Sequence, residues 1–150
     1  RQNAAGRAVL AALDSVPRSL FLDAAHKGLA YQDRAVPIDC GQTISQPTVV
    51  AMMTEALSLT PDMRVLEIGT GSGYHTAILA RLAKSVVSVE RYRRLSSLAA
   101  ERLKVLRLNN VALQVADGHA GWEAAAPYYG SCHRTVSSSH RWGRKTLFKN

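Results

Sequence analysis

The pattern in this sequence that is best suited to chemistry is a glycine-rich turn, residues 67–73, which reads EIGTGSG. It follows a short β-prone run and precedes a stretch with helical spacing, which is the context in which such a turn binds a ligand. Gly69, Gly71 and Gly73 permit a tight turn and let a ligand approach the backbone closely. Glu90 ends the next strand-like run, 21 residues after Gly69, where a carboxylate accepts hydrogen bonds from ribose hydroxyls. We therefore expect a site for the adenosine half of a ligand. The alternative for the glycines is a plain turn, and the alternative for Glu90 is a solvated carboxylate at the end of a strand.

The spacing of the glycines and the charge beside them indicate which adenosine ligand is expected. A dinucleotide-binding turn has the pattern G-x-G-x-x-G and places a pyrophosphate at a helix N-terminus. Here the third glycine is Gly73, and Tyr74 occupies the later position. The acidic Glu67 before the turn would oppose a phosphate but suit the sulfonium and ammonium groups of S-adenosylmethionine. The pattern favours this methyl donor, with a nicotinamide dinucleotide as the alternative, and the lack of Gly-Lys-Ser/Thr excludes a P-loop.

Alternating helical and β-prone runs must position this turn. Hydrophobic periodicity predicts helices over residues 4–14, 47–59, 74–84 and 92–108, and strands over 64–68, 86–90 and 111–115. Residues 28–42 predict an irregular segment with a short strand at 35–39, and Ser45, two residues before Pro47, predicts the N-cap region of the second helix. Two successive βαβ units require a parallel sheet with right-handed crossovers, so the expected fold class is α/β.

Length and charge set further limits. The 150 residues suit one domain, and the net charge is +8. Residues 1–128 hold 14 Lys and Arg against 11 Asp and Glu, a net of +3, whereas residues 129–150 hold five basic residues and no acidic one, a net of +5. A nucleic-acid methyltransferase is one hypothesis for a basic chain, but the charge belongs mainly to the tail, and no Asn/Asp-Pro-Pro-aromatic motif is present. We therefore expect no specific nucleic-acid partner and interpret Arg91, Arg93 and Arg94 as a solvated face.

The sequence contains no pattern typical of a metal site, a disulfide framework or a membrane-spanning segment. Cys40 and Cys132 lie far apart without a CxxC motif, so we expect two reduced thiols and no metal site. No window approaches the ~20 apolar residues of a membrane span, and the first residues lack the features of a secretory signal. These observations predict a cytoplasmic protein, which we expect to be a monomer. His75, which follows Tyr74, is interpreted as an ordinary helix residue.

The segments around the glycine-rich turn resemble one family. Residues 35–38 (AVPI), residues 41–47 (GQTISQP) and Met52, Met53 and Glu55 closely resemble the protein-L-isoaspartate O-methyltransferases. Residues 16–18 (VPR), 30–33 (AYQD), 65–74 (VLEIGTGSGY), 117–118 (DG) and 121–122 (GW) match as well. The stretch TISQP is highly specific to that family, and the resemblance runs from about residue 7 to residue 128.

This resemblance implies an activity and a site. Members of the family transfer a methyl group from S-adenosylmethionine to the α-carboxylate of L-isoaspartyl residues in damaged proteins, which begins their repair. On this chain the resemblance makes Ser45 the active-site hydroxyl, although spacing alone favours an N-cap. It makes Glu67, Gly69, Gly71, Gly73 and Glu90 cofactor-binding residues, and it places Asp117 with Gly118 near the adenine.

The last 22 residues depart from the resemblance. The family would continue with a buried apolar strand, but residues 129–150 are rich in Ser, Arg and His and have no strand or helix period. We therefore expect residues 1–128 to form an incomplete Rossmann-like methyltransferase domain that lacks its C-terminal strands, followed by an irregular basic tail at 129–150. A reading-frame change near residue 129 is our hypothesis for this tail. The strand at 64–68 would then be an exposed edge of the sheet, and we expect the protein to have low stability and weak or absent catalysis. The alternative function is a non-catalytic remnant that binds S-adenosylmethionine or misfolds.

Overall fold

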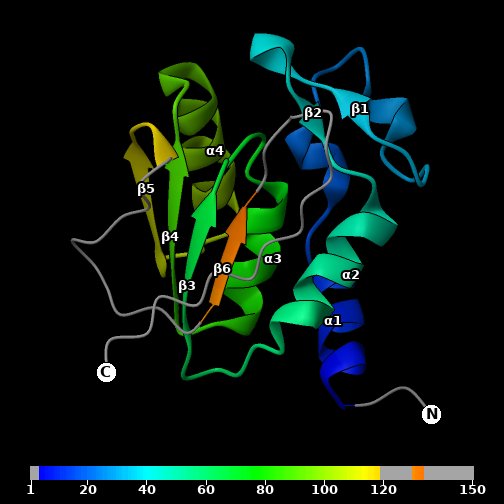
Figure 1. The fold of residues 1–150 in the computed structure, drawn as a ribbon. Coiled ribbons are helices and arrows are strands. Elements are labelled where there is room, and N and C mark those ends of the chain that lie inside the picture. The colour runs from blue at the N-terminus through cyan, green and yellow to red at the C-terminus, as the bar shows by residue number, and fades with distance from the viewer. Residues whose placement is uncertain (1–3, 119–129, 134–150) are drawn as a thin grey trace.

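A parallel sheet of four strands forms the centre of the protein (Figure 1). The computed structural model describes residues 4–118 and the backbone of residues 130–133. The strands are β3 (Arg64–Ile68), β4 (Ser85–Glu90), β5 (Val111–Val115) and β6 (Gly130–His133), in the spatial order β5-β4-β3-β6. Leu66 lies opposite Val87 in the register of β3 and β4. The predicted α/β class with a parallel sheet is confirmed.

Two helices make the crossovers between these strands. The helix α3 (Tyr74–Leu82) joins β3 to β4, and α4 (Arg93–Val105) joins β4 to β5. The predicted helices at 74–84 and 92–108 are confirmed, but both end earlier than periodicity suggested. The helix α4 ends early because Arg107 adopts a left-handed φ of 55° and the amide of Leu108 bonds back to the carbonyl of Leu103.

Both faces of the sheet carry buried apolar side chains, which explains why adjacent positions of β3 and β4 are both hydrophobic. One buried cluster packs between the sheet and α3 and contains Val65, Leu79, Ala80, Ala83 and Val86. The opposite face carries a second buried cluster, formed by Leu66, Ile68, Val87 and Val89. Alternate residues of one strand therefore serve two separate hydrophobic layers.

The N-terminal part of the chain packs beside α3 and reaches the carboxyl edge of the sheet. It contains α1 (Ala4–Ser15), α2 (Pro47–Leu57), the short antiparallel strands β1 (Val36–Pro37) and β2 (Thr43–Ile44), and the 3-10 turns η1 (Arg18–Phe21), η2 (Lys27–Leu29) and η3 (Asp39–Gly41). In Figure 1, α1 and α2 lie side by side, and β1 and β2 lie at the end of the molecule toward which the sheet strands point. The predicted first two helices and the short strand near residue 36 are confirmed.

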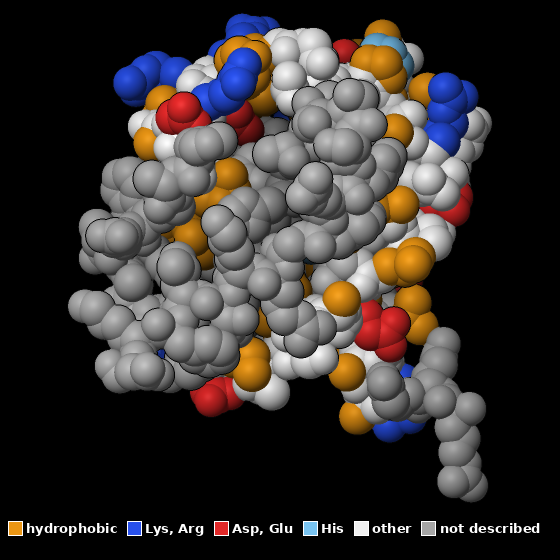
Figure 2. All heavy atoms as spheres, in the orientation of Figure 1, with side chains coloured by type: hydrophobic (Ala, Val, Ile, Leu, Met, Phe, Trp, Pro, Cys, Tyr) orange, Lys and Arg blue, Asp and Glu red, His pale blue; other side chains and the backbone are white. Residues whose placement is uncertain are grey.

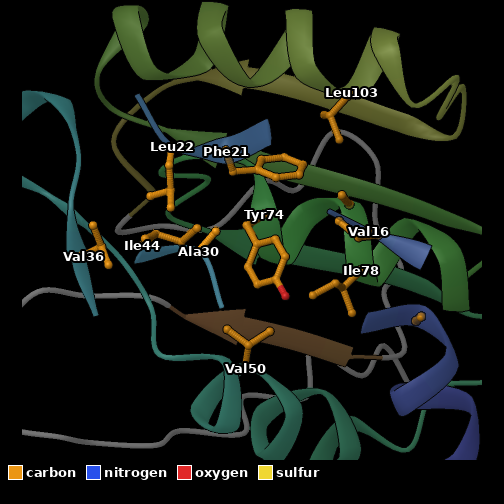
Figure 3. Close-up of a cluster of buried hydrophobic side chains, with 12 residues drawn as sticks. Val16, Phe21, Leu22, Ala30, Val36, Ile44, Val50, Tyr74, Ile78 and Leu103 are labelled. Atoms are coloured by element: carbon orange, nitrogen blue, oxygen red, sulfur yellow. The ribbon is translucent and has the colours of Figure 1, made fainter. Parts of the chain in front are cut away.

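A hydrophobic core joins this N-terminal part to the start of α3 (Figure 3). The rings of Phe21 and Tyr74 meet edge to face with centroids 5.5 Å apart. Ile44, Val50 and Ile78 belong to the same cluster and are at most 1% exposed. Burying each side chain of this size contributes about 1.5–3 kcal/mol, so the β2–α2 segment is held firmly against α3.

The strand β6 corrects the expectation for the tail. Residues 129–150 were predicted to be irregular and to leave β3 as a sheet edge, but Gly130–His133 pairs with β3 in parallel, with Val65 opposite Gly130 and Ile68 opposite His133. The prediction failed because strand pairing uses backbone groups, and β propensity depends strongly on context. In the described structure β3 is a central strand.

Several sequence expectations fall on residues outside the described part. These are Gly121 and Trp122, and the tail at 129 and 134–150. Within the described residues no helix is long and apolar enough to span a membrane.

Candidate active site

The glycine loop, residues 69–73, links β3 to α3 at the carboxyl edge of the sheet. Its glycines all have positive φ values, 93° for Gly69, 56° for Gly71 and 90° for Gly73. Other residues would lose about 1–2 kcal/mol at such angles, so the backbone conformation explains this pattern. The amide of Gly69 donates to the carbonyl of Val89 at 2.8 Å, and that of Gly73 donates to the carbonyl of Thr70 at 3.0 Å. The predicted tight turn is confirmed.

The far side of the glycine loop rests against α4. A Cβ atom at Gly73 would lie 2.9 Å from the Cβ atom of Ala99, which is too close for an ordinary contact. Arg102 of α4 donates from Nη1 to the carbonyl of Ser72 at 2.9 Å. Sequence reasoning missed this support from Arg102, because a basic residue on an amphipathic helix has no local signature of its partner.

Glu90 lies directly against the glycine loop, as its position at the end of β4 predicted. Its Oε2 accepts the amide of Gly71 at 2.8 Å, and its Oε1 accepts the amide of Tyr92 at 3.1 Å. The residue is 5% exposed. A carboxylate offers about four lone-pair positions, so Glu90 can accept further hydrogen bonds from a ligand while holding the loop.

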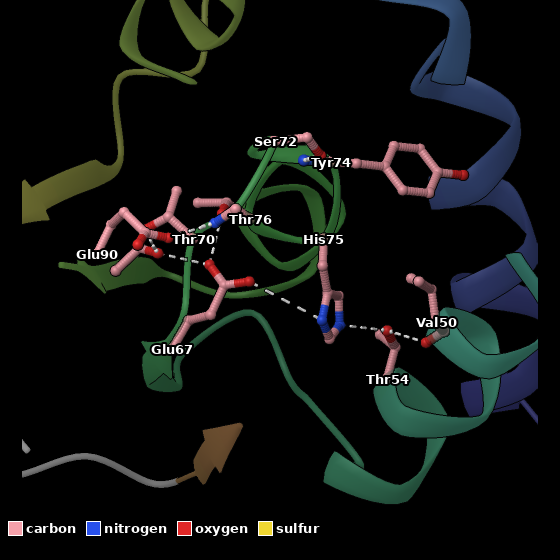
Figure 4. A network of polar contacts seen from close by, with 11 residues as sticks. Val50, Thr54, Glu67, Thr70, Ser72, Tyr74, His75, Thr76 and Glu90 are labelled. Carbon is pink, nitrogen blue, oxygen red and sulfur yellow. Dashed lines mark hydrogen bonds and ion pairs between the residues drawn. The ribbon is translucent and has the colours of Figure 1, made fainter. Parts of the chain in front are cut away.

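Glu67 lies beneath the loop and is fully buried (Figure 4). Its Oε2 accepts the hydroxyls of Thr76 at 2.5 Å and Ser88 at 2.6 Å. Because Ser88 has one hydroxyl proton and gives it to Glu67, Thr70 is the donor in the 2.6 Å contact between Thr70 and Ser88. Glu67 thus ties β3, β4 and α3 together below the loop, while its direct contact with a ligand stays a prediction.

The turn after β5 comes to the same edge of the sheet. The amide of Ala116 donates to the carbonyl of Glu90 at 3.1 Å, and the exposed Asp117 follows. A Cβ atom at Gly118 would lie 2.4 Å from Cγ2 of Ile68, so only glycine lets this turn cross the end of β3. The hydrogen bond to the Tyr92 hydroxyl, and then the charges of Asp117 and Glu90, raise the pKa of Arg91. The structure therefore brings Asp117 and Gly118 to the same edge as Glu90 and the glycine loop.

Ser45 does not cap α2, which corrects the interpretation from spacing alone. Gln46 occupies the N-cap position, and its side chain makes no capping bond to the helix. Asp33, from a distant turn, accepts the amide of Thr48 at 2.9 Å and its hydroxyl at 2.7 Å, together with the side-chain amide of Gln46 at 3.0 Å. These bonds, those from Thr48 first, hold the pKa of Asp33 below its usual value. Because Asp33 supplies the cap, the Ser45 hydroxyl is not needed for it.

Arg18 fixes the backbone of Ser45 and was not singled out from the sequence, although it stands in the VPR segment. The residue is 4% exposed. Its guanidinium donates to five backbone carbonyls, those of Leu29, Ala30, Gln32, Arg34 and Ser45, at 2.7–3.3 Å. Burial lowers the pKa of Arg18. Since a buried charge is tolerated only when it is well hydrogen-bonded, Arg18 and the turn at 29–34 specify each other and set the path of the chain into Ser45.

The hydrophobic core places Ser45 in relation to the glycine loop. Ser45 directly follows Ile44, and Tyr74 directly follows Gly73. Ile44 and Tyr74 belong to one buried cluster and point toward the same interior in Figure 3. Ser45 and Gly73 are thus each the sequence neighbour of a residue in this shared core, while Glu90 and the glycine loop lie at the carboxyl edge of the sheet.

The surface near this edge carries charges of both signs. In Figure 2, Lys and Arg side chains gather at the upper border of the face shown, with acidic side chains beside them. Arg94 pairs with Asp39 at 2.8 Å, and Arg91 lies over the ring of Tyr92 at 4.8 Å. In the part of the chain that the structure describes, no group of three or more His, Cys, Asp or Glu residues could hold a metal ion.

Comparison with known proteins confirms the family resemblance. The family model "Protein-L-isoaspartate(D-aspartate) O-methyltransferase (PCMT)" matches residues 1–140, which extends past residue 128, where we expected the resemblance to end. A protein-L-isoaspartate O-methyltransferase from Maricaulis maris is 55% identical over 120 residues, which cover 80% of this chain and 56% of that protein. A relative of the same name from Xanthobacter autotrophicus is 58% identical over 120 residues, covering 80% and 55%. The chain thus spans about half the length of the curated relatives that it matches.

Solved structures agree. A protein-L-isoaspartate O-methyltransferase structure superposes with a TM-score of 0.72 at 32% identity, covering 81% of this chain and 41% of that one. A putative protein-L-isoaspartate O-methyltransferase from Plasmodium falciparum, in complex with S-adenosyl-L-homocysteine, superposes with a TM-score of 0.60 at 26% identity, covering 71% and 53%. The Rossmann-like methyltransferase fold is therefore confirmed, and the chain belongs to the protein-L-isoaspartate O-methyltransferase family.

Proposed function

We propose that this protein transfers a methyl group from S-adenosylmethionine to the carboxylate of L-isoaspartyl residues in damaged proteins. The observations that support the proposal are a glycine loop held by Glu90 at the carboxyl edge of the sheet, and a shared hydrophobic core that contains both Tyr74, which follows the loop, and Ile44, which precedes Ser45. Family membership supports the choice of substrate. The chain's own residues support the two halves of the site, one for the cofactor and one for the substrate.

The residues at the carboxyl edge fit S-adenosylmethionine. The positive-φ Gly69 and Gly71 carry no side chain that would block a ligand from the loop backbone, whereas Gly73 lets the loop pack against α4. Glu90 keeps acceptor capacity for ribose hydroxyls beyond its two amide bonds. Asp117 and Gly118 border the same position and would lie near the adenine. The negative charge of Glu67 beneath the loop favours a cationic ligand and disfavours a pyrophosphate.

The chemistry asks mainly for alignment. S-adenosylmethionine supplies an electrophilic methyl group on a sulfonium when bound. A substrate carboxylate is already ionised near pH 7, so no strong general base is needed. The chain must hold the carboxylate oxygen in line with that methyl group, at a near-attack distance of about 3–3.5 Å. Ser45 can donate the orienting hydrogen bond, because Asp33 takes over the capping of α2 and Arg18 fixes the backbone of Ser45.

The test is transfer of labelled methyl groups to an isoaspartyl peptide, with the corresponding aspartyl peptide as control. We expect transfer to the isoaspartyl peptide alone, and loss of that transfer in Ser45→Ala with unchanged binding of S-adenosylhomocysteine. Equal labelling of both peptides would refute the substrate. Binding of S-adenosylhomocysteine without any transfer would instead support a non-catalytic protein that binds the cofactor.

We further infer that the protein acts as a monomer in the cytoplasm, without a metal, a membrane or a specific nucleic-acid partner. The mixed charge around Arg91 and Arg94 supports the last point. Light scattering on the purified chain tests the monomer, and cell fractionation tests the compartment. RNA binding that disappears on removal of residues 129–150 would be electrostatic only, whereas binding that persists would contradict this inference.

A further inference from the structure

His75 is a buried titratable residue next to the cofactor loop, to which the proposed chemistry assigns no role. It lies in the first turn of α3 and is 0% exposed. His75 does lie within a helix, as interpreted from the sequence, but its complete burial was not part of that interpretation. In Figure 4 its ring lies between Glu67 of β3 and Thr54 of α2, and it points toward both. Burying an imidazole requires partners for its ring nitrogens, and these partners come from two different parts of the site.

The hydrogen-bond directions on the α2 side follow from proton counting. The Thr54 hydroxyl donates its single proton to the carbonyl of Val50 at 2.7 Å. Its oxygen must therefore accept in the 2.9 Å contact with Nε2 of His75, so Nε2 carries a proton. The two hydrogen bonds of Thr54 therefore identify Nε2 as a protonated nitrogen of the His75 ring.

On the other side, His75 faces the network below the glycine loop. Its Nδ1 lies 3.9 Å from Oε1 of Glu67. The other oxygen of Glu67 accepts the hydroxyls of Thr76 and Ser88. A continuous line of polar contacts therefore runs from the backbone of α2, through Thr54 and His75, to the carboxylate that supports the loop.

The same helix also begins the substrate half of the proposed site. The helix α2 starts at Pro47, two residues after Ser45. Val50, whose carbonyl ends the polar line, is buried in the core with Ile44 and Tyr74. A shift of α3 relative to α2 would thus break the Thr54–His75 bond, and a shift of Glu67 would change the charge that faces the ring.

We propose that His75 is a positioning residue that couples the cofactor loop to α2, so that ligand binding at the loop is transmitted to the helix that follows Ser45. The inference rests on the proposed function, because the ligand at the loop is the cofactor or its product. The link is the donor bond from Nε2 to Thr54 on one side and the contact of Nδ1 with Glu67 on the other. Replacing the imidazole therefore weakens the response of α2 without removing any ligand contact.

The experiment compares the full chain with His75→Gln, His75→Asn and His75→Leu. A Gln amide reaches about as far as Nε2 and can keep the bond to Thr54, whereas an Asn amide reaches only about as far as Nδ1, and Leu keeps neither. Calorimetry measures the Kd of S-adenosylhomocysteine, and hydrogen exchange measures the protection that this ligand gives to residues 47–57. Thr54→Val removes the acceptor at similar volume, and Thr54→Ser is its matched control.

In the wild-type chain we expect S-adenosylhomocysteine to slow exchange in residues 47–57, and nitrogen NMR to show a protonated Nε2 on His75. The slowing should be lost in His75→Asn, His75→Leu and Thr54→Val, with a Kd weakened on the order of 10-fold. It should be kept in Thr54→Ser and kept in part in His75→Gln, because the Gln amide keeps the bond to Thr54 but not the contact with Glu67. Rescue by Gln but not by Asn separates positioning from simple filling of space. If His75→Leu does not fold, the Gln, Asn and Thr54 variants still decide the question.

Two outcomes overturn the inference in distinguishable ways. If the wild-type chain does not bind S-adenosylhomocysteine, the proposed function fails and the coupling fails with it. If the chain binds the ligand but residues 47–57 respond equally in wild type and in Thr54→Val, or if Asn rescues as well as Gln, the coupling alone is refuted.

Discussion

The left-handed conformation of Gly73 and its close packing on α4 lead to a prediction about stability. Alanine substitutions at three glycines distinguish the effect of backbone strain from that of steric overlap. At Gly28 the φ is ordinary, and a Cβ atom would meet nothing within 4 Å. At Gly41 a Cβ atom would also meet open space, but φ is +65°. At Gly73 φ is +90°, and a Cβ atom would lie 2.9 Å from Cβ of Ala99. Alanine at Gly28 therefore introduces no strain, and alanine at Gly41 introduces backbone strain alone. Alanine at Gly73 introduces backbone strain together with a steric overlap.

The magnitudes follow from these differences. Gly28→Ala should raise the free energy of unfolding slightly, by about 0.4–1 kcal/mol, because it restricts only the unfolded chain. Gly41→Ala should lower it by about 1–2 kcal/mol through the left-handed conformation. Gly73→Ala should lower the free energy of unfolding by the same amount and by a further ~1–3 kcal/mol because of overpacking against α4. The total loss is about 2–5 kcal/mol.

Urea unfolding followed by circular dichroism measures these differences. A second variant isolates the steric part. In an Ala99→Gly background the destabilisation by Gly73→Ala should fall toward that by Gly41→Ala, because the overlapping methyl group is gone and only the 3.3 Å approach to Cα of residue 99 remains. The double-mutant cycle should give a coupling equal to the lost overlap. A cost of Gly73→Ala no greater than that of Gly41→Ala, or no coupling with Ala99→Gly, would refute the close packing of the loop on α4.

Three further predictions concern the residues that hold the site. Arg18→Lys should lower the free energy of unfolding by about 2–4 kcal/mol, because a lysine cannot reach five carbonyls and leaves several unsatisfied; a loss below 1 kcal/mol in urea unfolding would contradict this. Glu90→Gln should weaken the Kd of S-adenosylhomocysteine by roughly 10–100-fold, since charged hydrogen bonds contribute about 1.5–3 kcal/mol; calorimetry checks this, and an unchanged Kd would count against a role for Glu90 in the cofactor site. Hydrogen bonds lower the pKa of Asp33 in the folded state from its ordinary 3.8, so its stabilisation is present above that pH and is lost as pH falls through the folded pKa. Asp33→Asn should therefore be less stable than wild type at pH 7 but not in strong acid, and a gap between the two that is independent of pH would disprove the cap.

The sequence alone determined the elements whose signals are local. Hydrophobic runs and helical spacing identified β3, α3, β4, α4 and β5, because the apolar residues of each recur with the period of its own secondary structure. The glycine loop was predictable for a similar reason, since its left-handed angles require glycine at given positions. Glu90 followed from its place at the end of the adjacent parallel strand, where topology puts it against the loop.

Only the tertiary structure decided the contacts between residues far apart in the sequence. Asp33 caps a helix that begins 14 residues later, Arg18 collects carbonyls as far away as Ser45, and β6 pairs with β3 although its residues have little strand propensity. His75 shows the same limit, because its neighbours in the sequence say nothing of Thr54 or Glu67. The physical reason is that a polar side chain or a backbone edge can bond to any partner that packing brings within reach, whereas glycine conformation and apolar periodicity are properties of the local chain.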